Sequence, residues 1–427
     1  MQRVPSAEDD IKALAEQVLE QLRVASFDGV GVTRESYGES ETQAMHLLAD
    51  VARAESLDVE FDAAVNLVIS LPGADEQRPF VACGSHLDSV PEGGNYDGAA
   101  GVLAGLLALI FLRRQGIVPP RTIKVYALRG EESAWFGLAY MGSRALLGLF
   151  AVDDFDLRHR TTGETLKSCM SAAGAQVERI AAGEPLLDPK RVGCYFELHI
   201  EQGPVMVARK IPVGVVTGIR GNYRHPSASC IGEAAHSGAV PRWLRKDAVF
   251  AFSEFVMRLD RHWQALLEQG QDLVVTVGVA STNPAEHAMS RVPGNVEFAL
   301  EFRSESAELL AAFEQLTRSE ASSIERLRGV EFSLGEPRLT APATMAPELV
   351  EMLCTICEAQ GVAHERMPSG AGHDAAVFAN CGIPSAMIFV RNEHGSHNPD
   401  EAMDMADYLL GVDVLTQALL SAPEALK

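Results

Sequence analysis

Apolar residues recur at helical spacing in several stretches of the chain. Residues 8–24 and 43–53 have the pattern of amphipathic helices, and Ser40 with Gln43 three residues later resembles a capping box before the second of them. Residues 99–112 are apolar or small at almost every position, which is typical of a helix buried on all sides. These stretches predict three helices in the first quarter of the chain.

Short runs rich in β-branched and aromatic residues separate the helical stretches. One strand begins near Val81, and the other strand-like runs lie at residues 59–61, 67–70, 122–128, 192–198 and 385–390. A further helix is expected over residues 346–359. Strands that alternate with helices predict an α/β sheet, and such sheets bind ligands at the carboxyl ends of their strands. Side chains at those ends are therefore the first candidates for chemistry.

The pattern changes near residue 215. Amphipathic helices and strand-like runs alternate there, at residues 247–267, 273–279, 296–302 and 307–327. This pattern predicts a small two-layer α+β domain over residues 215–329. The main α/β domain would then be formed by residues 1–214 and 330–427.

The charge and the cysteine content exclude several classes of partner and location. The 427-residue chain has a formal net charge of -22, whereas binding to nucleic acid or to an anionic membrane requires a basic face. The seven cysteines are scattered, so no disulfide framework is predicted and the cytoplasm is the expected location. Cys354 and Cys357 form a CxxC pair inside an apolar helical pattern, which favours the core over redox or metal chemistry. Residues 1–18 lack the apolar stretch of a signal peptide, and the run 99–112 is too short to span a bilayer.

Imidazole and carboxylate side chains follow the strand near Val81. His86 and Asp88 are two residues apart on extended chain and point the same way. Asp88 could therefore accept a hydrogen bond from one ring nitrogen of His86 and leave the other nitrogen for a metal ion. Asp97 offers two oxygens and could bridge two cations. Taken alone, a histidine and two aspartates in a surface loop are more often solvated than bound to a metal ion.

Further candidate ligands stand where two other strands are predicted to end. Glu131 and Glu132 follow the strand at 122–128, and His199 follows the strand at 192–198. One of the adjacent carboxylates could bind metal while the other acts as a base. Solvated acids and a core histidine are the alternatives, but three strand ends in one sheet favour a single shared site. The remaining polar candidates are His236, Arg303, His373 and His397.

An ordered set of motifs from about residue 30 to 403 resembles one known family. The set comprises GSHLDSVPEGGNYDGAAGVLAG, EES-x-x-FG, GSRA, ELHIEQGPV, IPVGVVTGI, GEAAHSG-x-x-P, VPGNVEF, SGAGHDA and SHNPDE. It is similar to the binuclear metallo-amidohydrolases that include N-carbamoyl-L-amino acid hydrolases, β-ureidopropionases and allantoate amidohydrolases, within the zinc aminoacylase and dipeptidase superfamily. The resemblance implies an α/β, mixed-sheet, metallopeptidase-like catalytic domain with an inserted lid or dimerisation domain.

The resemblance also implies two divalent metal ions that share Asp97. His86 and His199 would complete the first site, and Glu132 and His397 the second. Zinc is the expected metal, with manganese, cobalt and nickel as alternatives.

The other matching residues are implied to handle the substrate. Glu131 would be the general base, Asp88 the partner of His86, and His236 a donor to the scissile carbonyl. Arg303 would bind a substrate carboxylate. The other implied substrate-binding residues are Gln202, Ser290, Gly370, Ala371 and His373.

The chain departs from the family pattern near the expected substrate. Trp135 replaces an arginine beside the base, Ser290 replaces an asparagine, and the loop after His236 is altered. N-carbamoyl-L-amino acid hydrolysis, which yields an amino acid, CO2 and ammonia, is the first prediction. Allantoate-type ureido acids, N-acyl amino acids and dipeptides are the alternatives. A binding protein without turnover would lack ligands or the base, and all of these are present. We expect a small anionic substrate and a homodimer formed through the inserted domain.

Overall fold

The computed structural model describes residues 7–423 and divides the chain into two compact units. The first unit joins the chain up to Thr217 with the chain from Thr344 onward, and the second is Gly218–Ala343. The first six residues, on which part of the predicted absence of a signal peptide rests, lie outside the described range. Within that range no helix combines the length and apolar character needed to cross a membrane.

A nine-stranded mixed sheet forms the centre of the first unit, as far as residues 7–423 show. The strand order is β1-β2-β4-β3-β5-β16-β6-β14, with β15 paired to β6. The pairs β3-β4, β3-β5 and β5-β16 are parallel, and β1-β2, β2-β4 and β6-β16 are antiparallel. The predicted mixed α/β fold is therefore confirmed. The strands are β1 (Asp58–Phe61), β2 (Leu67–Leu71), β3 (Phe80–His86), β4 (Ile123–Leu128), β5 (Val192–Ile200), β6 (Val213–Ile219), β14 (Ala343–Thr344), β15 (His364–Ser369) and β16 (Ser385–Val390), with the small pair β17 (Asn392–Glu393) and β18 (Ala402–Met403).

Helices pack against this sheet, and the most apolar of them is the most central. α3 (Ala99–Arg114) contacts β3, β4, β5 and α12, which explains why almost all its side chains are apolar or small. Its first turn follows Asp97, so the core helix also anchors the loop that carries this residue. The other helices of the unit are α1 (Ala7–Ser26), α2 (Glu39–Ala54), α4 (Met141–Leu146), α5 (Leu166–Ala172), α6 (Val177–Ala181), α7 (Val205–Arg209), α10 (Pro347–Gln360), α11 (Asp374–Asn380) and α12 (Met405–Ser421).

The predicted capping box before α2 is wrong. The helix begins at Glu39, four residues earlier than predicted, and Gly38 occupies the N-cap without a side-chain hydrogen bond. Ser40 is already inside the first turn, and the side chain of Gln43 donates to Glu39 (3.0 Å). Two acidic residues in the first turn stabilise this start by facing the positive end of the helix dipole.

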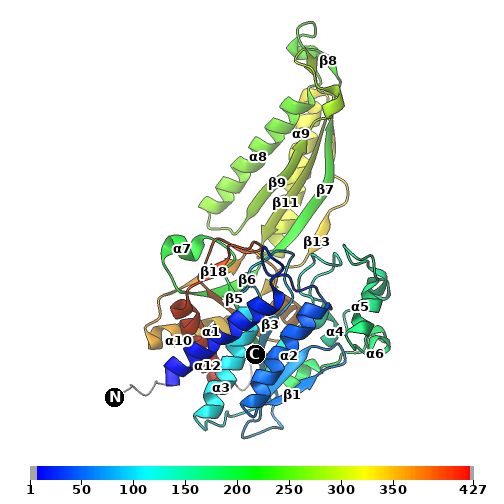
Figure 1. Ribbon diagram of the computed structural model, residues 1–427. Coiled ribbons are helices and arrows are strands. Elements are labelled where there is room, and N and C mark those ends of the chain that lie inside the picture. Colours follow the sequence, from blue (N-terminus) through cyan, green and yellow to red (C-terminus); the bar gives the residue numbers. More distant parts are fainter. Residues whose placement is uncertain (1–6, 424–427) are drawn as a thin grey trace. The chain divides into compact units, whose positions relative to one another are not determined.

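The second unit is a two-layer α+β structure. Its five-stranded sheet has the order β12-β7-β11-β9, with β13 also paired to β7, and α8 and α9 run along the strands (Figure 1). Buried and less buried residues alternate along β11, so one face of the sheet packs on the helices through a core rich in phenylalanine. The elements are β7 (Gly221–Ile231), β8 (Ala235–His236), α8 (Ala248–Glu268), β9 (Val274–Ser281), β10 (Arg291–Val292), β11 (Asn295–Ser304), α9 (Ala307–Arg328), β12 (Glu331–Ser333) and β13 (Arg338–Thr340).

The second unit extends further along the chain than the sequence pattern indicates. The predicted inserted domain ends at residue 329, but β12 and β13 both pair with β7, so the unit continues to Ala343. Each of these strands has only three residues, which is too short for a period-two pattern to be recognised.

Candidate metal centre

Two neighbouring strands and the loop before α3 bring together three buried side chains. His86 is the last residue of β3, His199 is the penultimate residue of β5, and Asp97 lies two residues before the first residue of α3. Asp97 Oδ1 lies 3.4 Å from His86 Nε2 and 3.2 Å from His199 Nε2. One carboxylate oxygen therefore faces two imidazole nitrogens, and the three ligand atoms are close enough to hold one metal ion.

The other oxygen of Asp97 faces a second group. His397 Nε2 lies 3.4 Å from Asp97 Oδ2 and 3.1 Å from Glu132 Oε1. These three residues also have their ligand atoms within bonding reach of a common ion. His397 is half exposed, whereas the first group is buried, so the second group is the more accessible one. Imidazole and carboxylate donors without thiolate suit zinc and related divalent ions.

Hydrogen bonds fix which ring nitrogen each buried histidine directs at Asp97. His86 Nδ1 lies 3.0 Å from the carbonyl oxygen of Asp88 and 3.2 Å from its Oδ1. His199 Nδ1 lies 2.9 Å from the carbonyl oxygen of Ile200. With an acceptor at each Nδ1, a neutral ring carries its proton there, which would leave the lone pair of each Nε2 for a metal ion.

Glu131 lies beside the first group without belonging to it. Its Oε2 is 3.9 Å from His86 Nε2, and its backbone N–H donates to Asp88 Oδ1 (2.9 Å). The N–H of Glu132 donates to the other oxygen of Asp88 (3.1 Å), so a single carboxylate orients both glutamates. Burial raises the pKa of Glu131, and His86 opposes that shift. A carboxylate with a raised pKa is suited to accept and return a proton.

Two strained residues contact or belong to the metal groups. Gln202 and His397 both have a φ of +61°, a conformation that is uncommon outside glycine. The side-chain amide of Gln202 donates to Asp97 Oδ2 (2.7 Å), as does the hydroxyl of Ser396 (2.5 Å). Gln202 therefore contacts the carboxylate that faces both donor groups, and its predicted role near the substrate stays a prediction.

Gly98 is required by its closeness to His86. Its φ is +66°, and a Cβ at this position would lie 2.5 Å from the imidazole ring of His86. Its N–H also points at His199 Nε2 (3.2 Å). The glycine after Asp97 thus lets the main chain pass directly against both imidazoles.

His373, which is predicted to line the substrate pocket, is buried behind a candidate metal ligand. It is only 1 % exposed, its Nε2 lies 2.9 Å from the hydroxyl of Ser369, and its ring packs on His199 with a centroid distance of 4.5 Å. Burial lowers its pKa, so the ring is neutral. It supports a metal-ligand candidate from behind, whereas Gly370 and Ala371 remain at least partly exposed.

Trp135, which replaces an arginine beside the base in the family pattern, is also buried. Its indole is 2 % exposed, stacks on His159 at 5.3 Å and donates from Nε1 to the carbonyl of Ser89 (2.8 Å). An apolar cluster that includes Phe136 and Phe155 accommodates it. The replacement of arginine by tryptophan therefore acts on packing behind the Asp88 loop.

Residues that the sequence interpretation missed hold this loop and the following glutamates. Arg34 is fully buried and donates through Nε to the carbonyl of Leu87, and the hydroxyl of Ser36 donates to Asp88 (2.7 Å). Glu41, also fully buried, accepts from Arg129 Nη1 (2.8 Å) and from the N–H of Gly130 (2.9 Å). The sequence contained one indication of this role: Glu41 lies at helical spacing from the apolar residues 44, 45 and 48, on the buried face of α2.

The remaining predicted residues belong to the second unit. His236 is exposed in β8, opposite Arg291 of β10, and its Nδ1 accepts from the N–H groups of Gly238 and Ala239 (3.2 Å each). The carbonyl of Ser290 accepts from the N–H of Ser237 (2.8 Å), so Ser290 lies beside His236. 

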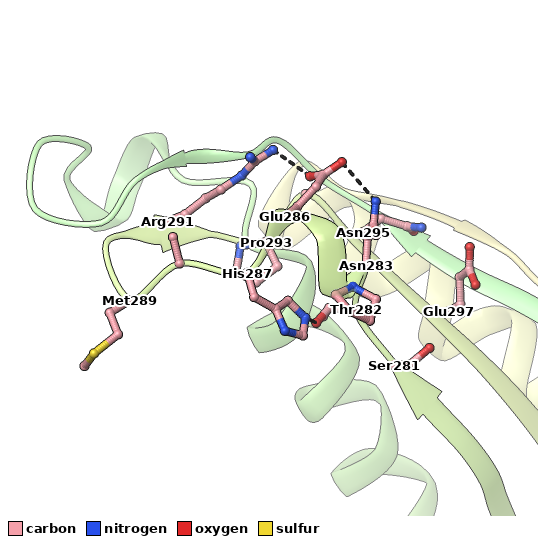
Figure 2. A pocket seen from close by; sticks show the side chains of 13 residues that line it. Ser281, Thr282, Asn283, Glu286, His287, Met289, Arg291, Pro293, Asn295 and Glu297 are labelled. Carbon is pink, nitrogen blue, oxygen red and sulfur yellow. Dashed lines mark hydrogen bonds and ion pairs between the residues drawn. The ribbon is translucent and has the colours of Figure 1, made fainter.

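A pocket of about 860 Å³ opens at the same end of this unit. Figure 2 shows its polar lining, in which Glu286 pairs with Arg291 and Thr282 bonds to His287. Arg303 lies elsewhere, near the end of β11, where its guanidinium is 3.1 Å from Glu301.

Comparison with known proteins agrees with the motif resemblance. The model of peptidase family M20/M25/M40 matches residues 82–421. The chain is 32% identical to an allantoate amidohydrolase of Escherichia coli, over 91% of this chain and 92% of that one. It is also 32% identical to an N-carbamoyl-L-amino acid amidohydrolase of Geobacillus stearothermophilus, over 94% and 96%. 

A solved structure agrees over almost the whole length. A hydantoinase/carbamoylase family amidase from Burkholderia ambifaria superposes with a TM-score of 0.85 at 29% identity, covering 98% of both chains. The family predicted from the motifs is thus confirmed: the chain belongs to peptidase family M20/M25/M40, as a hydrolase related to its amidohydrolases.

Proposed function

We propose that this chain is a metal-dependent amidohydrolase of small carbamoyl or ureido acids, with N-carbamoyl-L-amino acids as the first choice of substrate. One observation carries the proposal: the two oxygens of Asp97 face two separate donor groups, with Glu131 beside them. Two divalent ions, zinc first, fit these groups. The allantoate and N-carbamoyl substrates named for the relatives support the substrate class.

Glu131 is the proton carrier of the proposed reaction. Bound ions of this kind lower the pKa of water and polarise a carbonyl group. Glu131 accepts a proton from the attacking water and delivers it to the leaving nitrogen. Asp88 keeps the base in place, because it accepts the backbone N–H groups of Glu131 and Glu132.

His236 is suited to stabilise the developing oxyanion. Its Nδ1 accepts two backbone N–H groups, so in the neutral ring the proton is on Nε2. That N–H can donate to an oxyanion, and such donors contribute about 3 kcal/mol to transition-state stabilisation. Arg303 is suited to bind a carboxylate, because its planar guanidinium presents paired donors.

His236 and Arg303 are too far apart to bind the same small molecule within one chain. His236 pairs with β10, the strand that comes just before β11, whose first residue is Asn295. Arg303 lies eight residues further along β11, opposite Asn222, and β13 pairs with this same part of β7. Figure 1 shows β8 and β13 at opposite ends of the second unit. Eight residues of strand span about 25 Å, whereas a substrate of one or two residues spans at most about 7 Å. We therefore assign the two residues to different active sites of a homodimer.

Mixing two inactive variants tests this assignment. In a dimer of one Glu131→Gln chain and one His236→Ala chain, one site regains both residues if His236 serves the partner. Random exchange should then restore about a quarter of the wild-type rate. Activity that remains absent after proven subunit exchange, or a monomer in sedimentation, would contradict the shared site.

The expected cytoplasmic location stays a prediction.

A substrate panel tests the proposed function itself. We expect the zinc- or manganese-loaded protein to release ammonia from an N-carbamoyl-L-amino acid, allantoate or β-ureidopropionate. N-acetyl amino acids and dipeptides should be cleaved more slowly, as followed by the appearance of free amine. Cleavage of acyl or peptide substrates with no ammonia from any ureido compound would assign the chain to a different amide.

A further inference from the structure

Tyr140 lies in an unusual conformation eight residues after the second of the two adjacent glutamates. It caps α4 with φ 61° and ψ 33°, in the left-handed region that a residue with a side chain rarely adopts. Its backbone N–H donates to the carbonyl of Glu131 (3.0 Å), and its own carbonyl accepts the N–H of Arg144 (2.8 Å). Strained backbone of this kind persists where the surroundings fix it, often at functional sites.

The phenol ring of Tyr140 reaches across to the loop that carries His373. A Cβ at Gly372 would lie 1.8 Å from Tyr140 Oη, so the phenol head occupies the space that a side chain at 372 would take. The next residue, His373, packs on His199 of the first metal group. Tyr140 therefore contacts both the main chain of Glu131 and the loop of Gly372 and His373 that packs on His199, and all of these residues belong to the first unit.

The hydroxyl of Tyr140 is available for a ligand. The residue is partly exposed, and among residues 7–423 its hydroxyl has no hydrogen-bond partner. Burial and the carboxylates of Glu131 and Asp374 raise its pKa, so it keeps its proton. A protonated phenol both donates and accepts hydrogen bonds.

We propose that the Tyr140 hydroxyl determines specificity by accepting a hydrogen bond from the terminal NH2 of a carbamoyl or ureido group. This inference rests on the proposed function, in which Glu131 serves the scissile carbon. The substituent on that carbon then falls near the tyrosine that is bonded to the Glu131 main chain. A carbamoyl substrate carries NH2 at this position, whereas an acetyl substrate carries a methyl group that leaves the hydroxyl unpaired.

The test compares two substrates that differ only at this substituent. The N-carbamoyl and N-acetyl derivatives of one L-amino acid are assayed with wild type, Tyr140→Phe and Tyr126→Phe. The ratio of the two kcat/KM values cancels differences in folding and metal content, since both substrates meet the same preparation. Tyr126 is a matched control because it is a buried tyrosine of β4. Besides burial, the carboxylates that raise its pKa are those of Asp62 and Glu60, which belong to neither metal group.

We expect Tyr140→Phe to lower the carbamoyl-to-acetyl ratio about tenfold, the value of one hydrogen bond, and Tyr126→Phe to leave it unchanged. A ratio that Tyr140→Phe does not change, in an enzyme whose wild type prefers the carbamoyl substrate, would overturn the role of Tyr140 and leave the proposed function intact. An equal fall in both variants would overturn it as well. A wild type that cleaves only the acetyl substrate would overturn both proposals.

Discussion

Replacing Glu131 by glutamine is expected to lower kcat by roughly 10³-fold, since general acid–base groups contribute about 10²–10⁴-fold. Glutamine keeps the size of the side chain but cannot accept a proton from water. The backbone N–H of residue 131 would still donate to Asp88, so the main chain should stay in place. The measurement is the initial rate on the best substrate, together with the metal content of the same sample.

Metal content separates the possible roles of Glu131. Glu131 lies outside both groups of candidate ligands, so Glu131→Gln should keep the wild-type metal content. Loss of metal would show that Glu131 is a ligand, and a rate above a tenth of wild type would show that it is not the base. Glu60→Gln is a suitable control, because its side chain is 63% exposed and pairs with Lys124 on the surface.

Replacing Glu41 by alanine is expected to have the largest effect on stability. The buried guanidinium of Arg129 would lose its carboxylate, and removing one partner of a buried ion pair costs about 3–5 kcal/mol. The N–H groups of Tyr37 and Gly130 would also lose their acceptor. We expect the melting temperature to fall by about 5–10 °C. Because Gly130 precedes Glu131, the rate should also fall at temperatures where the variant is folded.

The control for Glu41 lies on the same helix. Glu39 is exposed, bonds to the side chain of Gln43, and its replacement by alanine should cost less than about 1 kcal/mol. Thermal unfolding is best followed with a chelator present, so that metal binding does not contribute. If Glu41→Ala and Glu39→Ala have the same melting temperature, the buried pair of Glu41 and Arg129 does not stabilise the fold. Adding Arg129→Met to Glu41→Ala should recover part of the loss, because the unpaired charge is then removed.

The sequence by itself determined the long helices and strands and the candidate ligands. Strand and helix periods predicted β3, α3, β4 and β5 closely, because a buried sheet requires long apolar runs that are visible locally. His86, Glu132 and His199 were identified as candidates because each follows an apolar strand pattern, and three such strand ends in one sheet favour a single shared site. The ordered set of motifs also predicted the family to which the chain belongs.

Only the tertiary structure decided what surrounds these residues. The pairing of Glu41 with Arg129 joins positions 88 residues apart, and local patterns do not encode such contacts. His373 and Trp135 have sequence neighbours typical of a pocket, yet packing against His199 and His159 buries both. The position of Tyr140 over Gly372 likewise depends on two distant loops meeting. Local patterns specify elements and their ends, whereas contacts between distant segments form only when the whole core packs together.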